Sequence, residues 1–249
     1  MFETTKGLVL RSVRYKESDK ILTVLTESEG KLTLRARGAL RKGGKLAAAT
    51  ELYTLSEMTL FGNRGRWQLN EAQTIEQFIG LRENFSSLAL ASYFAEVLDT
   101  VSEEGAPDPA VLQLALNCLY ALSRALAPAP LVKAVFELRL MAITGYEPEL
   151  TACASCGRQD FQSAAFYAPD GAIYCGDCLH AAPGAVTHLM PETLAAMRHI
   201  VYSAPKRIFS FTLGEAALQQ LGACCEQFIL LQLERGFASL DYWKKVKDL

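Results

Sequence analysis

Two matched pairs of cysteines constrain the fold of this chain more than any other feature. Four of its seven cysteines form two C-x-x-C motifs separated by 18 residues: Cys153, Cys156, Cys175 and Cys178. Motifs at this separation can place four thiolates tetrahedrally around one zinc ion, with the segment between them folded as a ribbon or hairpin. Two short apolar runs, 165–167 and 172–174, flank a Pro-Asp-Gly turn in that segment. The spacing predicts a zinc-ribbon-like insert over residues 150–182.

We interpret this zinc site as structural. Four thiolates fill a tetrahedral shell and leave no position for a water molecule or a substrate. None of the three histidines lies in an H-E-x-x-H or H-x-E pattern, which catalytic zinc sites use: His180, His188 and His199. Disulfides are the alternative, but the start of the chain has no apolar block of signal-peptide length, so we expect a soluble, cytoplasmic protein with reduced thiols.

The first eighty residues predict a small barrel. Five segments are rich in Leu, Val, Thr and aromatic residues, with turn formers between them: 6–16, 20–27, 31–37, 50–61 and 66–73. Five strands in about eighty residues suggest an OB-fold, although an SH3-like barrel fits nearly as well, because the number of strands does not separate the two.

One strand of this barrel carries a row of cations. From residue 31 to 37 apolar and polar residues alternate, so that lysine and arginine side chains share one face of the strand. The loop that follows adds more cations, and no acidic residue occurs from 31 to 45. We predict an anion-binding surface without a counter-charge, the alternative being a solvated strand and a flexible loop. With two arginines further on, the candidate DNA-binding residues are Lys31, Arg35, Arg37, Arg41, Lys42, Lys45, Arg64 and Arg66.

Charge is unevenly distributed along the chain, although the total is only −2. Residues 1–70 carry 13 Lys and Arg against 7 Asp and Glu, whereas residues 71–249 carry 12 against 20. A basic small domain attached to an acidic body favours nucleic acid as the partner of the first part. No apolar, uncharged run reaches the roughly 18 residues that a membrane span needs.

After residue 82 the pattern becomes helical. We expect about five helices, over residues 84–103, from 109 to the prolines at 128 and 130, and over 131–144, 191–203 and 215–235. Asp108 should cap the second, and Lys133 and Glu137 should lie one turn apart on the solvent side of the third. Residues 241–247 are interpreted as a solvated helix end or an auxiliary DNA contact. The predicted fold class is α+β, with an OB-fold domain at 1–80 and a helical domain at 81–249.

Catalytic signatures are missing. The run from Gly38 to Lys45 differs from the phosphate loop G-x-x-x-x-G-K-[ST] because Leu46 stands where the hydroxyl residue belongs. Carboxylates in turns and at helix ends are explained by capping and solvation. We therefore expect no catalytic residues and no enzyme activity.

The order of these parts resembles the bacterial recombination mediator RecO family over essentially the whole chain. The similarity lies in ETTKGLVLRSVRYKESDKILTVLTESEGKLTLRARGALR, LFGNRGRWQLNEAQ, TGYEPELTACASC and CGDC. It implies an OB-fold, a helical domain with a zinc-binding insert, and binding of single- and double-stranded DNA. It also implies annealing, and loading of RecA with RecR and single-strand-binding protein in gap and double-strand-break repair at the nucleoid. The matching positions are Arg35, Arg37, Arg41 and Lys42 for DNA and the four cysteines for metal.

Two questions stay open at this point. Trp67 and Tyr15 lie beside cations and are candidates for stacking on bases, but both can equally belong to the core. The alternative function, from a different class, is a protein-interaction adaptor whose acidic helical body is the working surface and whose barrel binds an acidic peptide.

Overall fold

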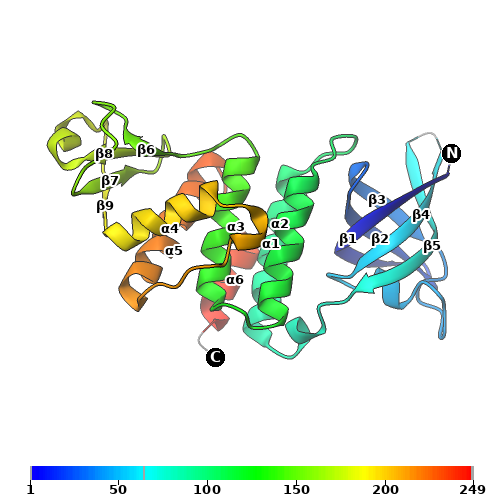
Figure 1. The fold of residues 1–249 in the computed structure, drawn as a ribbon. Coiled ribbons are helices and arrows are strands. Elements are labelled where there is room, and N and C mark those ends of the chain that lie inside the picture. The colour runs from blue at the N-terminus through cyan, green and yellow to red at the C-terminus, as the bar shows by residue number, and fades with distance from the viewer. Residues whose placement is uncertain (1, 64, 248–249) are drawn as a thin grey trace. The chain divides into compact units, whose positions relative to one another are not determined.

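The computed structural model describes residues 2–63 and 65–247 of the chain. Two compact units form, one from Met1–Arg124 with Phe237–Leu249 and the other from Ala125–Gly236. Within the described residues, the first unit contains a closed barrel and three α-helices, and the second contains three α-helices and a four-stranded sheet (Figure 1). The predicted α+β class, with a barrel followed by helices, is confirmed. The division into an OB-fold domain at 1–80 and a helical domain at 81–249 stays a prediction.

The barrel has the strand order of an OB-fold. Its five strands are β1 (Phe2–Tyr15), β2 (Asp19–Thr26), β3 (Gly30–Ala36), β4 (Leu55–Asn63) and β5 (Arg66–Glu76). They close in the order β1-β2-β3-β5-β4, with β4 returning to β1, and β3 and β5 run parallel while the other pairs are antiparallel (Figure 1). This order separates the OB-fold from the SH3-like alternative.

Strand β3 has the alternation that the sequence predicts. Leu32, Leu34 and Ala36 are fully buried in the barrel core, and Arg35 and Arg37 lie on the outside. The core residues around them come from every strand and from the segment after β3: Val9, Leu22, Val24, Ala39, Met58, Leu60 and Leu69. The outer face of β3 is therefore backed by a packed core.

Three helices complete the first unit: α1 (Phe85–Val101), α2 (Pro109–Ser123) and α6 (Ala238–Val246). Asp108 caps α2 as predicted, because its Oδ1 accepts hydrogen bonds from the backbone N–H groups of Ala110 and Val111. The prediction of a solvated helix end holds for the exposed residues Tyr242, Lys244 and Lys245 but is wrong for Trp243. Helix α6 packs against α1 with Trp243 buried, since an indole and two aliphatic side chains on one helical face need an apolar partner.

The second unit is built around α3 (Ala129–Ile143), α4 (Pro191–Tyr202) and α5 (Glu215–Gln232). Its sheet has the order β6-β8-β7-β9, from β6 (Glu149–Cys153), β7 (Ala164–Tyr167), β8 (Ala172–Cys175) and β9 (Thr187–Leu189). Strands β7 and β8 form the hairpin that the two apolar runs predict. Among the helices of the described ranges, none combines the length and apolar character that crossing a bilayer requires.

The predicted solvent position of Lys133 and Glu137 is wrong. Their side chains are 4% and 0% exposed, and Lys133 Nζ lies 2.8 Å from Glu137 Oε1 and 2.9 Å from Glu226 Oε2 of α5. Burial lowers the pKa of Lys133, but the two carboxylates outweigh it and the pKa is raised, so the ammonium stays charged. The pattern of one helix could not show this, because the second carboxylate comes from another helix.

Candidate nucleic-acid interface and metal centre

The end of β3 and the turn between β1 and β2 enclose a pocket of about 670 Å³ on the barrel, here called the cationic hollow. Its two sides are more than fifteen residues apart in sequence, and the antiparallel pairing of β2 with β3, which sets Lys20 opposite Ala36, brings them together. The residues that line it are Lys16, Glu17, Ser18, Asp19, Arg35, Arg37, Gly38 and Arg41.

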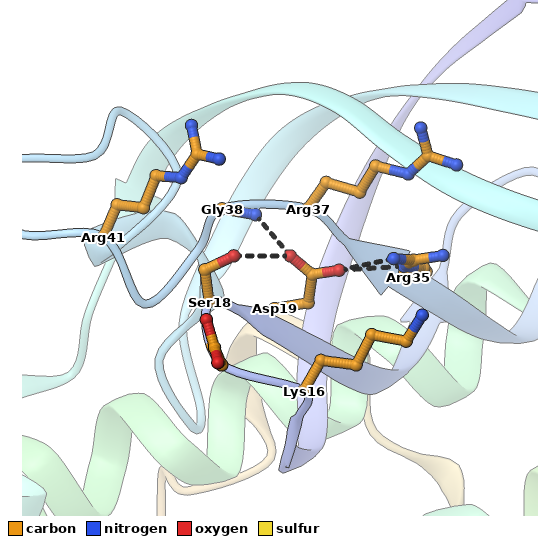
Figure 2. Close-up of a pocket in the computed structure, with 8 residues that line it drawn as sticks. Lys16, Ser18, Asp19, Arg35, Arg37, Gly38 and Arg41 are labelled. Carbon is orange, nitrogen blue, oxygen red and sulfur yellow. Dashed lines mark hydrogen bonds and ion pairs between the residues drawn. The ribbon is translucent and has the colours of Figure 1, made fainter.

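Asp19 organises the cationic hollow. Its Oδ2 accepts hydrogen bonds from Arg35 Nε at 3.0 Å and Nη2 at 2.7 Å, and its Oδ1 accepts one from the Gly38 N–H at 2.9 Å (Figure 2). The Gly38 N–H and then the Arg35 guanidinium lower the pKa of Asp19 to about 2. Gly38 takes a φ of +68°, which a glycine adopts without strain, and so presents its N–H to the carboxylate. One carboxylate thus fixes both an arginine and the turn after β3.

The predicted absence of counter-charges is wrong at two positions. Arg35 pairs with Asp19 at 2.7 Å, and Lys31 pairs with Asp99 Oδ1 of α1 at 3.0 Å. Both acids lie outside the 31–45 stretch, so its composition could not reveal them. Arg37 and Arg41 differ, because both are exposed and their guanidinium groups extend away from Asp19 on the same side of the hollow (Figure 2).

A second pocket, of about 500 Å³, lies on the other side of Arg35 and Arg37, which line both. We call it the aromatic hollow, because Phe61 and Trp67 lie in its wall together with Arg66. Its lining comes from β2, β3, β4, β5 and two residues just outside these strands, Arg37 and Gly65: Ile21, Thr33, Leu34, Arg35, Arg37, Phe61, Gly65, Arg66, Trp67 and Gln68.

The structure brings four of the eight predicted cations to these hollows: Arg35, Arg37, Arg41 and Arg66. Lys42 and Lys45 are exposed on the loop after Gly38, outside both linings. Lys31 lies at the opposite end of β3, paired with α1, and Arg64 falls outside the described residues. The sequence prediction did not include Asp19 and Lys16. The signal that could have found them is the antiparallel pairing of the two strands that it did predict, at 20–27 and 31–37, which brings the start of the first beside the end of the second.

The two stacking candidates have different surroundings. Tyr15 is 40% exposed, and the Arg35 guanidinium carbon lies 5.3 Å from its ring centroid. Trp67 is half-buried against the barrel core, and its Nε1–H donates a hydrogen bond to Glu104 Oε1 at 2.9 Å. The Trp67 ring is therefore held in the wall of the aromatic hollow, whereas Tyr15 belongs to the lining of neither hollow.

The four cysteines of the two C-x-x-C motifs meet in the second unit, as the sequence predicts. Their sulfur atoms all lie within 4.8 Å of one another, and Cys156 Sγ and Cys175 Sγ are 3.8 Å apart. Zn–S bonds of about 2.3 Å in a tetrahedron place sulfur atoms about 3.8 Å apart, whereas a disulfide needs about 2.05 Å. The four thiols therefore have the donor set and the spacing for a tetrahedral zinc ion.

The backbone around Cys153 favours its thiolate, whereas hydrogen bonds with Cys156 and Cys175 raise the pKa of Cys178 to about 12. Burial opposes ionisation of Cys153, but N–H groups of Cys175, Cys156 and Ser155 outweigh it and lower the pKa of Cys153 to about 6. The Cys175 N–H donates to Cys153 Sγ at 3.3 Å. Arg158 adds a positive charge beside Cys156 and Cys175 and pairs with Asp177 at 2.7 Å. The chain itself thus partly offsets the charge of four thiolates.

Comparison with known proteins places the whole chain in one group. Residues 1–78 match the family model described as recombination protein O N terminal, and residues 82–241 match that described as recombination protein O C terminal. A DNA repair protein RecO of Acetivibrio thermocellus is 32% identical over 96% of this chain and 95% of its own length. Those of Alkaliphilus metalliredigens and Symbiobacterium thermophilum are 28% and 30% identical over 99% and 95% of this chain, and over 100% and 94% of their own lengths.

Proposed function

Because this chain belongs to the recombination protein O (RecO) family of DNA repair proteins, we propose that its barrel binds DNA at the two hollows. The function is that of a recombination mediator without covalent chemistry, acting in the cytoplasm at the nucleoid. It binds single- and double-stranded DNA, anneals complementary strands, and loads RecA together with RecR on DNA coated with single-strand-binding protein.

The position of the hollows carries this proposal. OB-folds bind oligonucleotides on the face of strands 2 and 3 and with the loops between strands 1 and 2 and between strands 4 and 5. The cationic hollow is lined by the β1–β2 turn, and the aromatic hollow by β2, β3 and the start of β5. Cations gathered on that face of a rigid barrel can follow the phosphates of a polynucleotide.

The cations contribute unequally. Arg37 and Arg41 bear the largest share, because both are exposed at the cationic hollow, and Arg66 acts at the aromatic hollow. Arg35 is held in place by Asp19 and contributes as a fixed charge. Lys42 and Lys45 extend the contact along the loop, while Lys31 contributes least because Asp99 engages its ammonium. Arg64, which lies outside the described residues, stays a candidate from the sequence alone.

Annealing follows from the same charges. Two complementary strands repel each other through their phosphates, and cations that neutralise phosphates on one strand reduce the repulsion that the second strand meets. Exposed arginines on a platform that does not read bases serve any sequence alike.

The cysteine cluster holds one structural zinc ion in this proposal. Cys153, Cys156, Cys175 and Cys178 supply four thiolates, and zinc bound by four thiolates stabilises a fold without offering a catalytic position. Because the cluster joins the end of β6 to the end of β8 and the following turn, the ion supports the sheet of the second unit.

Charge reversal at the cationic hollow tests the function. Arg37→Glu with Arg41→Glu should weaken binding of a labelled single-stranded oligonucleotide on the order of tenfold or more at about 0.1 M salt, equally for different sequences. The matched control is Lys206→Glu with Arg207→Glu, two exposed cations of the second unit, which should stay close to the unmodified protein. Unchanged affinity in the first variant, measured by fluorescence anisotropy, contradicts the proposal.

A protein-interaction adaptor is the second candidate, and exposed apolar side chains favour it. Ile79, Phe85 and Tyr242 in the first unit are 58%, 55% and 48% exposed, and the rings of Phe85 and Tyr242 lie 6.1 Å apart. Such side chains are typical of surfaces that bind proteins. Competition separates the candidates, because a single-stranded oligonucleotide displaces a labelled acidic peptide from the barrel only if both use the cationic face.

A further inference from the structure

The two hollows differ in chemistry although they share Arg35 and Arg37. The cationic hollow adds Lys16 and Arg41 and has no aromatic residue in its lining, so it suits a phosphate. The aromatic hollow adds two aromatic rings, Phe61 and Trp67, and the partly buried side chain of Ile21. A flat apolar group bordered by arginines is the ligand that this second lining favours.

The Trp67 ring is held as one wall of the aromatic hollow. A Cβ atom at Gly62, its partner on β4, would lie 2.8 Å from Trp67 Cζ3, so the ring packs over the strand only because that position is glycine. The hydrogen bond from Trp67 Nε1 to Glu104 fixes the rotation of the indole. An aromatic side chain that is fixed before binding loses little entropy when a ring stacks on it.

We propose that the aromatic hollow receives an unpaired nucleobase while Arg37 and Arg41 hold the adjoining phosphate at the cationic hollow. This inference rests on the proposed function and adds a ligand chemistry to it. The bases of a duplex are paired and stacked on each other, so a duplex cannot fill the aromatic hollow without extruding one of its bases. The hollow therefore favours single strands, whereas the cationic hollow serves both forms of DNA.

The size and the position of the hollow agree with this ligand. About 500 Å³ lies within the roughly 300–1,000 Å³ typical of sites for small organic groups. Arg35 and Arg37 line both hollows, so the two hollows adjoin and can take the base and the phosphate of neighbouring nucleotides. Base–aromatic stacking at such sites changes affinity by about 5- to 150-fold per base.

Abasic oligonucleotides test the inference on the full chain. A labelled oligothymidylate and an abasic strand of equal length carry the same phosphates and differ only in their bases. The unmodified protein should bind oligothymidylate about 5- to 150-fold more tightly, with quenching of Trp67 fluorescence by oligothymidylate alone. Equal affinities would overturn the inference and leave the proposed function intact, whereas failure to bind either strand would contradict the proposed function itself.

Two variants assign the effect to the hollow. Trp67→Leu should bring the ratio of the two affinities toward one, and Arg41→Ala should weaken both strands by the same factor. Tyr120→Leu, which removes a 46% exposed aromatic ring on α2, is the matched control and should keep the full ratio. Circular dichroism checks that the Trp67 variant folds, and an unchanged ratio in the folded variant would overturn the assignment.

Discussion

The cationic face of the barrel and the cysteine cluster of the second unit are both assembled from separate chain segments, but they hold their polar groups in opposite ways. On the barrel, Arg37 and Arg41 are exposed and extend away from Asp19. In the cluster, the sulfur atoms turn toward one another within 4.8 Å. An open set of cations can exchange a polyanion, whereas a closed set of thiolates is committed to one small ion. In the proposed function the chain therefore separates the groups that bind DNA from the groups that stabilise the fold.

Replacing a cysteine of the cluster should produce the largest effect on stability. If the protein tolerates the replacement, the contrast between the two regions is refuted. Cys175→Ser removes one of the four thiols that hold zinc in the proposed function, and a structural metal contributes folding free energy directly. We expect the melting temperature to fall on the order of 10 °C, while DNA affinity of the folded fraction changes little. Elemental analysis should give one zinc per chain before the substitution and much less after it.

A serine at a buried cysteine outside the cluster is the control for this experiment. Cys118→Ser, on α2, changes the same atom in a fully buried position, and it should leave the zinc content at one per chain. If Cys175→Ser retained full zinc, or lost DNA affinity as steeply as stability, the separation between binding and stabilising groups would be refuted.

The buried ion cluster of the second unit should give the next largest effect. Lys133→Met removes the ammonium that the carboxylates of Glu137 and Glu226 both contact, so the free energy of unfolding should fall by about 3–5 kcal/mol. Adding Glu137→Leu should restore much of the loss, since the fully buried carboxylate is then gone as well. Chemical denaturation measures the free energy of unfolding of the single and the double variant. If Lys133→Met alone were as stable as the unmodified protein, the buried arrangement of these charges would be contradicted.

A smaller effect is expected at Asp19, where the binding face itself depends on a counter-charge. The pKa of Asp19 falls from 3.8 to about 2 in the fold, so its ionised form stabilises the native state. That contribution is complete above about pH 4 and is lost as the pH falls through about 2. The melting temperatures of the unmodified protein and Asp19→Asn should therefore differ at neutral pH and converge near pH 2. A difference that stays constant over this range would contradict the role of Asp19.

How much of the molecule the sequence predicts depends on whether the signal is local. The C-x-x-C spacing, the alternation around Leu34 and the cap at Asp108 each lie within a short segment, and all three are confirmed. The strand order of the barrel could not be predicted from the number of strands, because pairing of β3 with β5 is decided by packing across the whole barrel.

Pairings between distant segments account for the wrong predictions. Asp19 and Asp99 reach Arg35 and Lys31 from another strand and from a helix. Glu226 reaches Lys133 from another helix of the second unit, and α6 buries Trp243 against α1. In each case the sequence pattern predicted a solvent-exposed charge or indole, because its partner is far away in the sequence. The composition of a segment shows which charges it carries but not which of them stay available.

The dependence of binding on salt tests the central claim most directly. With about four phosphate contacts on the barrel, the logarithm of affinity for single strands should fall against the logarithm of salt concentration with a slope near −3. Replacing Arg37 and Arg41 together with alanine should reduce the slope to about −1.4. A slope that is equally steep in this variant would show that other cations hold the DNA and would contradict the account.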